Sequence, residues 1–237
     1  MDTEVMDDIR CEVVELRQYT LHPGRRDTLI RLFESALLEP QEAAGMRLLG
    51  QFRDLDDPDR FVWLRGFRDM TARPAALGAF YGGPVWRAHR DAANATMIDS
   101  DDVLLLRPAG RFPPAAERHR SHDDGSLIVA TICLLAEPVH AFRRFFEARL
   151  RPVLDATRGS PIASFETEPA ENNFPSLPVR TGETVFVWLA RFPDPIAYDE
   201  HWDRVTRSPA WRAALWEHLQ EPPRPLRLRP TPRSLLC

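Results

Sequence analysis

Two segments of this 237-residue chain repeat one another, and this repeat constrains the fold more than any other feature of the sequence. The letters FVWL stand at residues 61–64 and again at 186–189, an offset of 125 residues. Further along, Trp86 aligns with Trp211 at the same offset and without a gap. Paired tryptophans seldom match by accident. We therefore expect two copies of one module rather than a single large domain.

The repeat sets the predicted domain boundaries. The first module spans residues 10–108, a polar linker spans 109–125, and the second module spans 126–230. Upstream of the FVWL segments the offset between the copies is 113 rather than 125. The difference of twelve residues predicts an insertion in the second module, at residues 168–180.

Apolar periodicity gives each module the same order of elements: strand, helix, strand, strand, helix, strand. Asp69 and Asp194 stand where N-cap carboxylates would begin the second helix of each copy. The order βαββαβ is that of the ferredoxin-like module, an α+β fold whose helices cover one face of an antiparallel sheet. The other face also needs cover. We therefore expect two tandem modules that pack sheet to sheet and enclose a barrel-like interior within one chain.

Charge and composition exclude several classes of function. The net charge of −4 and the pI near 6.0 predict neither a nucleic-acid partner nor a membrane surface. All 31 basic residues are arginine, so neither a lysine Schiff base nor a P-loop lysine is available. The chain also lacks the GxGxxG, GxSxG and HExxH motifs.

Cysteine usage and the first residues predict a cytoplasmic protein. Cys11, Cys133 and Cys237 form no CxxC pair, which favours a reducing compartment. The opening residues show no basic and apolar pattern of a signal peptide. His119 and His122 are metal-ligand types, but they lie in the linker without a second cluster, so no metal site is predicted.

The first strand of the first module has a polar face that combines Glu15, Arg17 and Tyr19 at a spacing of two residues. At the offset of 113 the second module has only apolar residues at these places: Ile128, Ala130 and Ile132. If this face looks into the barrel, it forms the polar wall of one pocket for an amphipathic organic molecule. The alternative is an exposed Glu15–Arg17 ion pair beside a packed tyrosine.

Arg65 alternates with three aromatic residues on its strand, Phe61, Trp63 and Phe67, so it should point to the same side as they do. A buried arginine requires an anionic partner. Arg65 could hold a substrate carboxylate or phenolate beside Trp63, or it could neutralise Glu15. Trp63 itself, which is repeated in the second copy, could equally be part of the core.

The insertion contributes Asn172, Asn173 and Arg180 as hydrogen-bond donors beside Phe174. As a lid it would cover one mouth of the barrel and complete the substrate-binding site. The alternative is a long loop that packs on the surface or on another subunit.

Residues 15–24 (ELRQYTLHPG), 61–63 (FVW), Arg73 and 84–86 (PVW) resemble the NIPSNAP family of the dimeric α/β-barrel superfamily. The second module carries further matches: 172–175 (NNFP), 177–180 (LPVR), 187–188 (VW) and 209–211 (PAW). The resemblance implies a tandem-duplicated dimeric α/β barrel. It also implies a superfamily that holds cofactor-free monooxygenases, isomerases, cyclases and some haem enzymes.

These observations together predict a small-molecule-binding protein, expected to act without a cofactor as a monooxygenase, isomerase or cyclase on an aromatic or polyketide-like compound of secondary metabolism. Tyr19 or His89 would transfer a proton, and Arg17 and Arg65 would stabilise an enolate or phenolate. One alternative is a non-catalytic binding or assembly protein, with a homodimer among the possible assemblies. A further alternative is a haem protein with His201 as the iron ligand.

Overall fold

The computed structural model describes residues 11–110 and 125–237. The first module follows the predicted order of elements, and its first helix contains a π-helical turn. Its elements are β1 (Val13–Leu21), α1 (Arg26–Leu32), the π turn (Phe33–Leu37), α2 (Leu38–Ala43), β2 (Arg47–Asp54), β3 (Arg60–Phe67), α3 (Ala72–Tyr81), α4 (Pro84–Asn94) and β4 (Met97–Pro108).

The second module repeats this order, including the π turn at the equivalent place. Its elements are β5 (Leu127–Leu134), α5 (Val139–Phe145), the π turn (Phe146–Leu150), α6 (Arg151–Ala156), β6 (Pro161–Thr167), β7 (Val185–Phe192), α7 (Pro195–Thr206), α8 (Pro209–Glu217) and β8 (Arg224–Pro230). None of the helices within the described ranges is long and apolar enough to cross a membrane.

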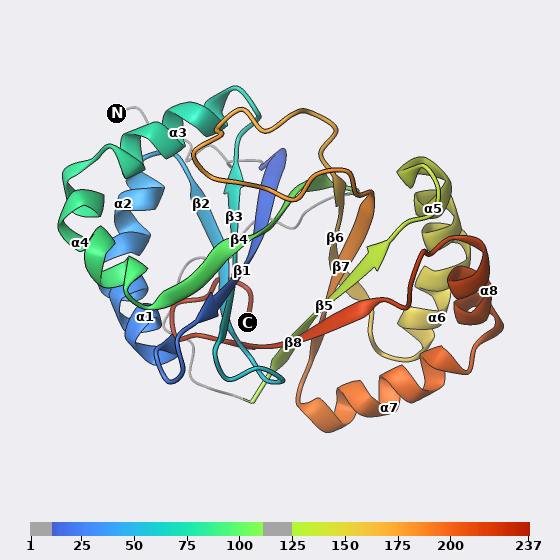
Figure 1. The fold of residues 1–237 in the computed structure, drawn as a ribbon. Helices are drawn as coiled ribbons and strands as arrows, with labels where there is room; N and C mark the ends of the chain where they lie inside the picture. Colours follow the sequence, from blue (N-terminus) through green and yellow to red (C-terminus); the bar gives the residue numbers. More distant parts are fainter. Residues whose placement is uncertain (1–10, 111–124) are drawn as a thin grey trace, which may run out of the picture.

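The eight strands form one closed antiparallel barrel in the order β1-β3-β2-β8-β5-β7-β6-β4. Each module contributes four neighbouring strands, and the two sets join edge to edge (Figure 1). On one side Phe52 of β2 pairs with Pro230 of β8, and on the other Leu106 of β4 pairs with Thr167 of β6. The predicted α+β fold of two ferredoxin-like modules is confirmed. Strand pairing, in addition to packing of the sheets, closes the barrel.

Helix boundaries follow from local chemistry. Asp194 caps α7 by accepting a hydrogen bond from the backbone N–H of Ala197 at 2.8 Å, and Asp69 accepts one from Ala72 at 2.7 Å. The first helix continues to Ala43 through the π turn. Pro40 follows this turn; because proline donates no N–H, the regular helical hydrogen bonds shift at this place.

The barrel divides the core into an inner layer and two outer layers. The inner faces of the strands are apolar, with Val14, Leu16 and Leu189 among the buried residues that fill the interior. The helices of each module pack on the outside of its own four strands, on the left and right of Figure 1. Each module therefore has a second core between sheet and helices.

Candidate functional site

The polar face of β1 lies against the helices of the first module and does not look into the barrel. Glu15 contacts Arg73 of α3, and Tyr19 belongs to the sheet–helix core, whereas Val14 and Leu16 fill the barrel. The prediction that this face forms an inner wall of the barrel is therefore wrong.

The register of the strands also corrects the predicted alignment of the two first strands. Glu15 pairs with Arg65, and the corresponding pair in the second module is Val129 with Ala190, so the first strands align at an offset of 114. The expected offset of 113 was one residue short. Because successive residues of a strand point to opposite faces, a slip of one residue exchanges the two sides.

Glu15 is the centre of a buried cluster of charges. Its Oε2 accepts from Arg17 Nη1 at 2.6 Å and from Arg65 Nε at 2.8 Å, and its Oε1 accepts from Arg73 Nε at 2.8 Å. The second nitrogens of Arg65 and Arg73 also lie 2.7 Å from the carboxylate. All four residues are at most 1% exposed. We refer to Glu15, Arg17, Arg65 and Arg73 as the arginine cluster.

The arginine cluster has a surplus of positive charge. In the described part of the chain, Glu15 is the one carboxylate that contacts these three guanidinium groups. Burial alone would raise the pKa of Glu15, but Arg65, Arg17 and Arg73 lower it to about 2. Burial lowers the pKa of Arg73, since the charged form has lost its water and faces Arg65 and Arg17. A second anion placed here would therefore be strongly attracted.

Tyr19 and Trp63 extend the cluster along the sheet. Arg17 Nε donates to the hydroxyl of Tyr19 at 3.1 Å, and its guanidinium lies 5.5 Å from the ring of Trp63. Burial raises the pKa of Tyr19, so the phenol keeps its proton at neutral pH. Because the oxygen of Tyr19 accepts from Arg17, its hydrogen is available for an acceptor on a ligand.

Several polar atoms next to Arg17 have no partner among the described residues. Trp63 lies between Arg17 and Gln51 in the strand register. The indole nitrogen of Trp63 and both amide atoms of Gln51 are buried without a hydrogen bond. Buried polar groups are nearly always satisfied, so these atoms favour a polar ligand or ordered water in this layer.

The insertion of the second module, residues 168–180, lies over the arginine cluster; we call it the strap. Arg73 Nη1 donates to Asn172 Oδ1 and to Asn173 Oδ1, each at 2.9 Å, and Asn173 donates to the backbone oxygen of Met70. Figure 1 shows the strap as the orange loop that runs from the end of β6 across to α3. The two modules thus share one site.

Apolar and charged contacts hold the strap in place. Phe174 packs against the sheet–helix core of the first module. Arg180 donates its backbone N–H to Val103 at 2.9 Å, and its guanidinium pairs with Asp102 and Glu183. Arg180 therefore anchors the strap to β4 and does not enter the arginine cluster.

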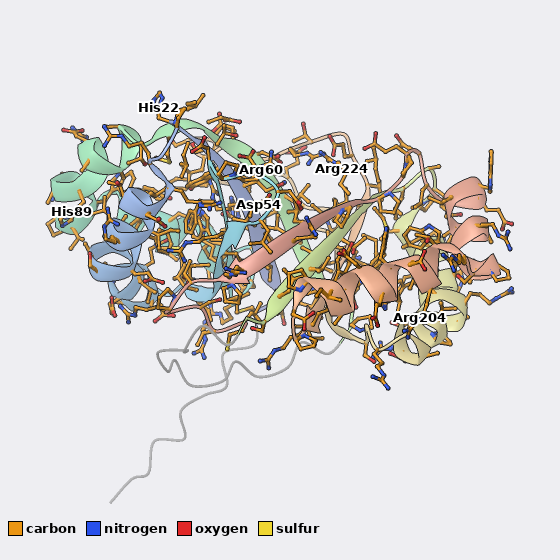
Figure 2. All side chains as sticks on the ribbon, turned by 90° about the horizontal axis from the view of Figure 1, so that it is seen from below. His22, Asp54, Arg60, His89, Arg204 and Arg224 are labelled. Carbon is orange, nitrogen blue, oxygen red and sulfur yellow. The ribbon has the colours of Figure 1, made fainter. Side chains whose placement is uncertain are left out.

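The structure brings together most of the candidate residues but separates the histidines from them. His89 is half-buried on α4 at the outer end of the first module (Figure 2), and none of the hydrogen bonds described for the arginine cluster reaches it. His119 and His122 lie outside the described residues. No group of three metal-ligand side chains occurs in residues 11–110 and 125–237.

His201, the candidate haem ligand, is enclosed by protein. Thr157 Oγ1 lies 2.8 Å from its Nδ1, and its ring centroid is 5.0 Å from that of Phe192. Even a Cβ atom added at Gly159 would come within 2.1 Å of the imidazole. A porphyrin needs far more room than this on one face of the ring, so the residues around His201 do not fit haem.

Sequence reasoning missed Arg73 and Gln41 as members of the site. Arg65 Nη1 lies 3.4 Å from Gln41 Oε1 and 3.3 Å from the hydroxyl of Tyr81. One signal for Arg73 was present: it stands on the apolar stripe of its helix, in line with Leu77 and Phe80. An arginine in such a stripe is buried and requires an anion.

Fold and site together define a single-chain dimeric α/β barrel with a buried charged site in one of its two modules. Residues 14–113 match the family model described as NIPSNAP. The first module of this chain is thus similar to the NIPSNAP family over 100 of the 237 residues.

Solved structures with the same fold support this assignment of class. The putative monooxygenase of Lactobacillus acidophilus NCFM has a TM-score of 0.54 at 13% identity and covers 95% of this chain and 98% of its own. The putative monooxygenase of Fusobacterium nucleatum has a TM-score of 0.57 at 8% identity and covers 92% of this chain and 91% of its own.

A third structure matches one module. An uncharacterized NIPSNAP domain protein from Burkholderia xenovorans, 20% identical, covers 43% of this chain and 98% of its own, with a TM-score of 0.39. No curated protein sequence matches the chain.

Proposed function

We propose that the first module binds a small organic anion between its sheet and α3, and that the protein is a cofactor-independent enzyme of the isomerase, cyclase or monooxygenase type acting on an aromatic or polyketide-like compound. The observation that carries this proposal is the surplus of buried positive charge, three guanidinium groups against the single carboxylate of Glu15. A carboxylate, phenolate or enolate would compensate this charge.

The chemistry of the site suits a ligand that develops negative charge on oxygen. Arg17 and Arg65 hold fixed positive charges in a layer without solvent, where electrostatic stabilisation is strong. The hydroxyl of Tyr19 is positioned to donate its hydrogen to an oxygen of the ligand. Tyr19 thus takes the proton-transfer role in preference to His89, which lies on the outside of the module.

Entry to the site requires the strap to move. The charged groups of the arginine cluster are closed off from solvent, and Asn172 and Asn173 bind the outermost guanidinium, that of Arg73. Release of these two contacts would expose Arg73 first. The strap then acts as a lid that closes over bound ligand and excludes water.

Calorimetric titration with salicylate, which combines a carboxylate with a phenol, tests this proposal. We expect salicylate to bind, with a loss of affinity of about tenfold or more at the arginine cluster in Arg17→Met and no change in the control Arg204→Met. Arg204 is exposed on α7 and pairs only with Glu200 among the described residues. Salicylate that binds Arg17→Met as tightly as the wild-type protein would exclude the arginine cluster as the site.

The complete closure of the arginine cluster favours one second candidate. The cluster and the strap could act only as a clamp that holds the two modules together in a non-catalytic binding or assembly protein. In that case Arg73→Met would lower stability, and no organic anion would bind at the arginine cluster. Anion binding together with turnover that falls in Tyr19→Phe would distinguish the enzyme from the clamp.

A further inference from the structure

A cavity of about 320 Å³ lies at one end of the barrel, and none of the proposals above uses it. Gln18 of β1, Ile132 of β5 and Leu226 of β8 line it from the barrel side, and Arg60, Pro223, Arg224 and Pro225 complete the wall. Small-molecule sites begin at about this volume. Gln18 points to the opposite side of β1 from Arg17 and Tyr19, so this cavity is separate from the arginine cluster.

The floor of the cavity is apolar and rigid. Ile132 and Leu226 belong to the buried core of the barrel. Pro223 and Pro225 flank Arg224 and restrict the backbone at the start of β8. A short hydrocarbon or aromatic body would therefore find a preformed surface here, at little cost in ordering the protein.

One polar group in the wall has no partner. Gln18 is only 6% exposed, and its amide nitrogen makes no hydrogen bond within the described part of the chain. A buried N–H group without an acceptor carries an energetic cost, because it has lost its hydrogen bonds to water. A ligand that presents a carboxylate or carbonyl oxygen to this nitrogen would remove that cost.

Two arginines stand at the rim, one from each module, and Figure 2 labels both. Arg60 is already held by Asp54 at 3.4 Å and Asp57 at 3.2 Å. Arg224 is half exposed and meets Glu221 only at 3.9 Å, the outer limit of an ion pair. Such exposed pairs contribute little, so Arg224 can exchange Glu221 for the carboxylate of a ligand.

We propose that this cavity is a second ligand site, which binds a small carboxylate with a short apolar body. The apolar body lies against Ile132 and Leu226, and the carboxylate accepts hydrogen bonds from the amide of Gln18 and from Arg224. Since Gln18 and Ile132 come from different modules, the site exists only in the closed barrel.

Calorimetric titration with octanoate, octan-1-ol and octylamine tests whether the cavity binds a ligand and whether it prefers a negatively charged head group. We expect octanoate to bind about tenfold more tightly than octan-1-ol and octylamine to bind more weakly still. Arg224→Gln, an exposed change that leaves the core intact, should weaken octanoate about fivefold. Ile132→Trp should fill the cavity and abolish binding, and its thermal unfolding midpoint shows whether it folds.

A control on α7 shows whether the effect is local to the cavity. Arg204→Gln removes an exposed arginine outside the cavity lining and should leave octanoate affinity unchanged. The proposal is overturned if octanoate does not bind or if octylamine binds better than octanoate. It is also overturned if Arg224→Gln and a folded Ile132→Trp both bind octanoate as tightly as the wild-type protein does.

Discussion

The two modules share a backbone but differ in the layer between sheet and helices. Where the first module has the arginine cluster, the same strand and helix positions of the second carry no charge. Glu15, Arg17, Arg65 and Arg73 correspond to Val129, Thr131, Ala190 and Tyr198. The tryptophans Trp63 and Trp188 occupy the same place in both. Aromatic packing is therefore common to the two copies, and the charges belong to one.

The second module fills the equivalent space with a neutral ring. His201 occupies the position of Ala76 and packs on Phe192 and Gly159, with a pKa that burial lowers below its ordinary 6.5. A layer packed in this way stabilises the second module. The first module instead keeps mutually repelling guanidinium groups in a buried layer, as functional sites often do at the expense of stability. The comparison therefore contrasts a charged buried layer in the first copy with a neutral, packed layer in the second.

The largest effect is expected from Glu15→Gln, which leaves three buried guanidinium groups without their carboxylate. We expect the free energy of unfolding to fall by about 3–5 kcal/mol, measured by urea denaturation at pH 7. The matched change Glu200→Gln removes an exposed ion pair of α7 and should cost less than about 1 kcal/mol. If the free energy of unfolding fell by a similar amount in both variants, the buried charges of the first module would stabilise the protein no more than an exposed ion pair of the second.

Lowering the pH should reveal the contribution of Glu15 to stability without a mutation. The pKa of Glu15 is about 2 in the folded protein and 4.5 in its ordinary state, so the unfolded chain binds more protons between these values. The stabilisation is complete above pH 4.5 and is lost as the pH falls towards 2, at most about 3 kcal/mol. Urea denaturation from pH 6 to pH 3 should show this loss in the wild-type protein, and a smaller one in Glu15→Gln.

The contacts of the strap should contribute an intermediate amount to the free energy of unfolding. The double change Asn172→Ala and Asn173→Ala removes two acceptors from Arg73 and should lower the free energy of unfolding by about 2 kcal/mol. Faster proteolysis within residues 168–180 should accompany this loss. Asn94→Ala, at an exposed helix end, is the control. A strap that stays equally protected in the double variant would show that these contacts do not close it.

The smallest effect should come from His201 in the second module. Because burial lowers its pKa, His201 contributes stability above pH 6.5, and this is lost as the pH falls below that value. Denaturation at pH 7 and pH 5.5 should show a smaller pH effect in His201→Gln than in the wild-type protein. His22→Gln, on the surface, should leave the pH effect unchanged. An unaltered pH effect in His201→Gln would assign it to another group.

Sequence reasoning reached the fold and much of the site because both depend on local periodicity. The repeat gave the two modules, and alternation along the strands placed Glu15, Arg17 and Arg65 on one face. It failed where one residue decided the outcome, since an alignment offset of 113 rather than 114 matched Glu15 with Ile128 instead of Val129. The contact of Asn172 with Arg73 joins residues 99 positions apart, and no local pattern encodes such a distance.

The edge-to-edge pairing of β2 with β8 and of β4 with β6 also decides how the stability of the barrel depends on protein concentration. In a barrel built from two separate subunits, dilution shifts the equilibrium towards monomers, and stability depends on concentration. Here both pairings are intramolecular, so the effective concentration of one half for the other is fixed by the linking chain. The barrel therefore stays closed at any dilution, and each half is free to accumulate substitutions that the other does not share.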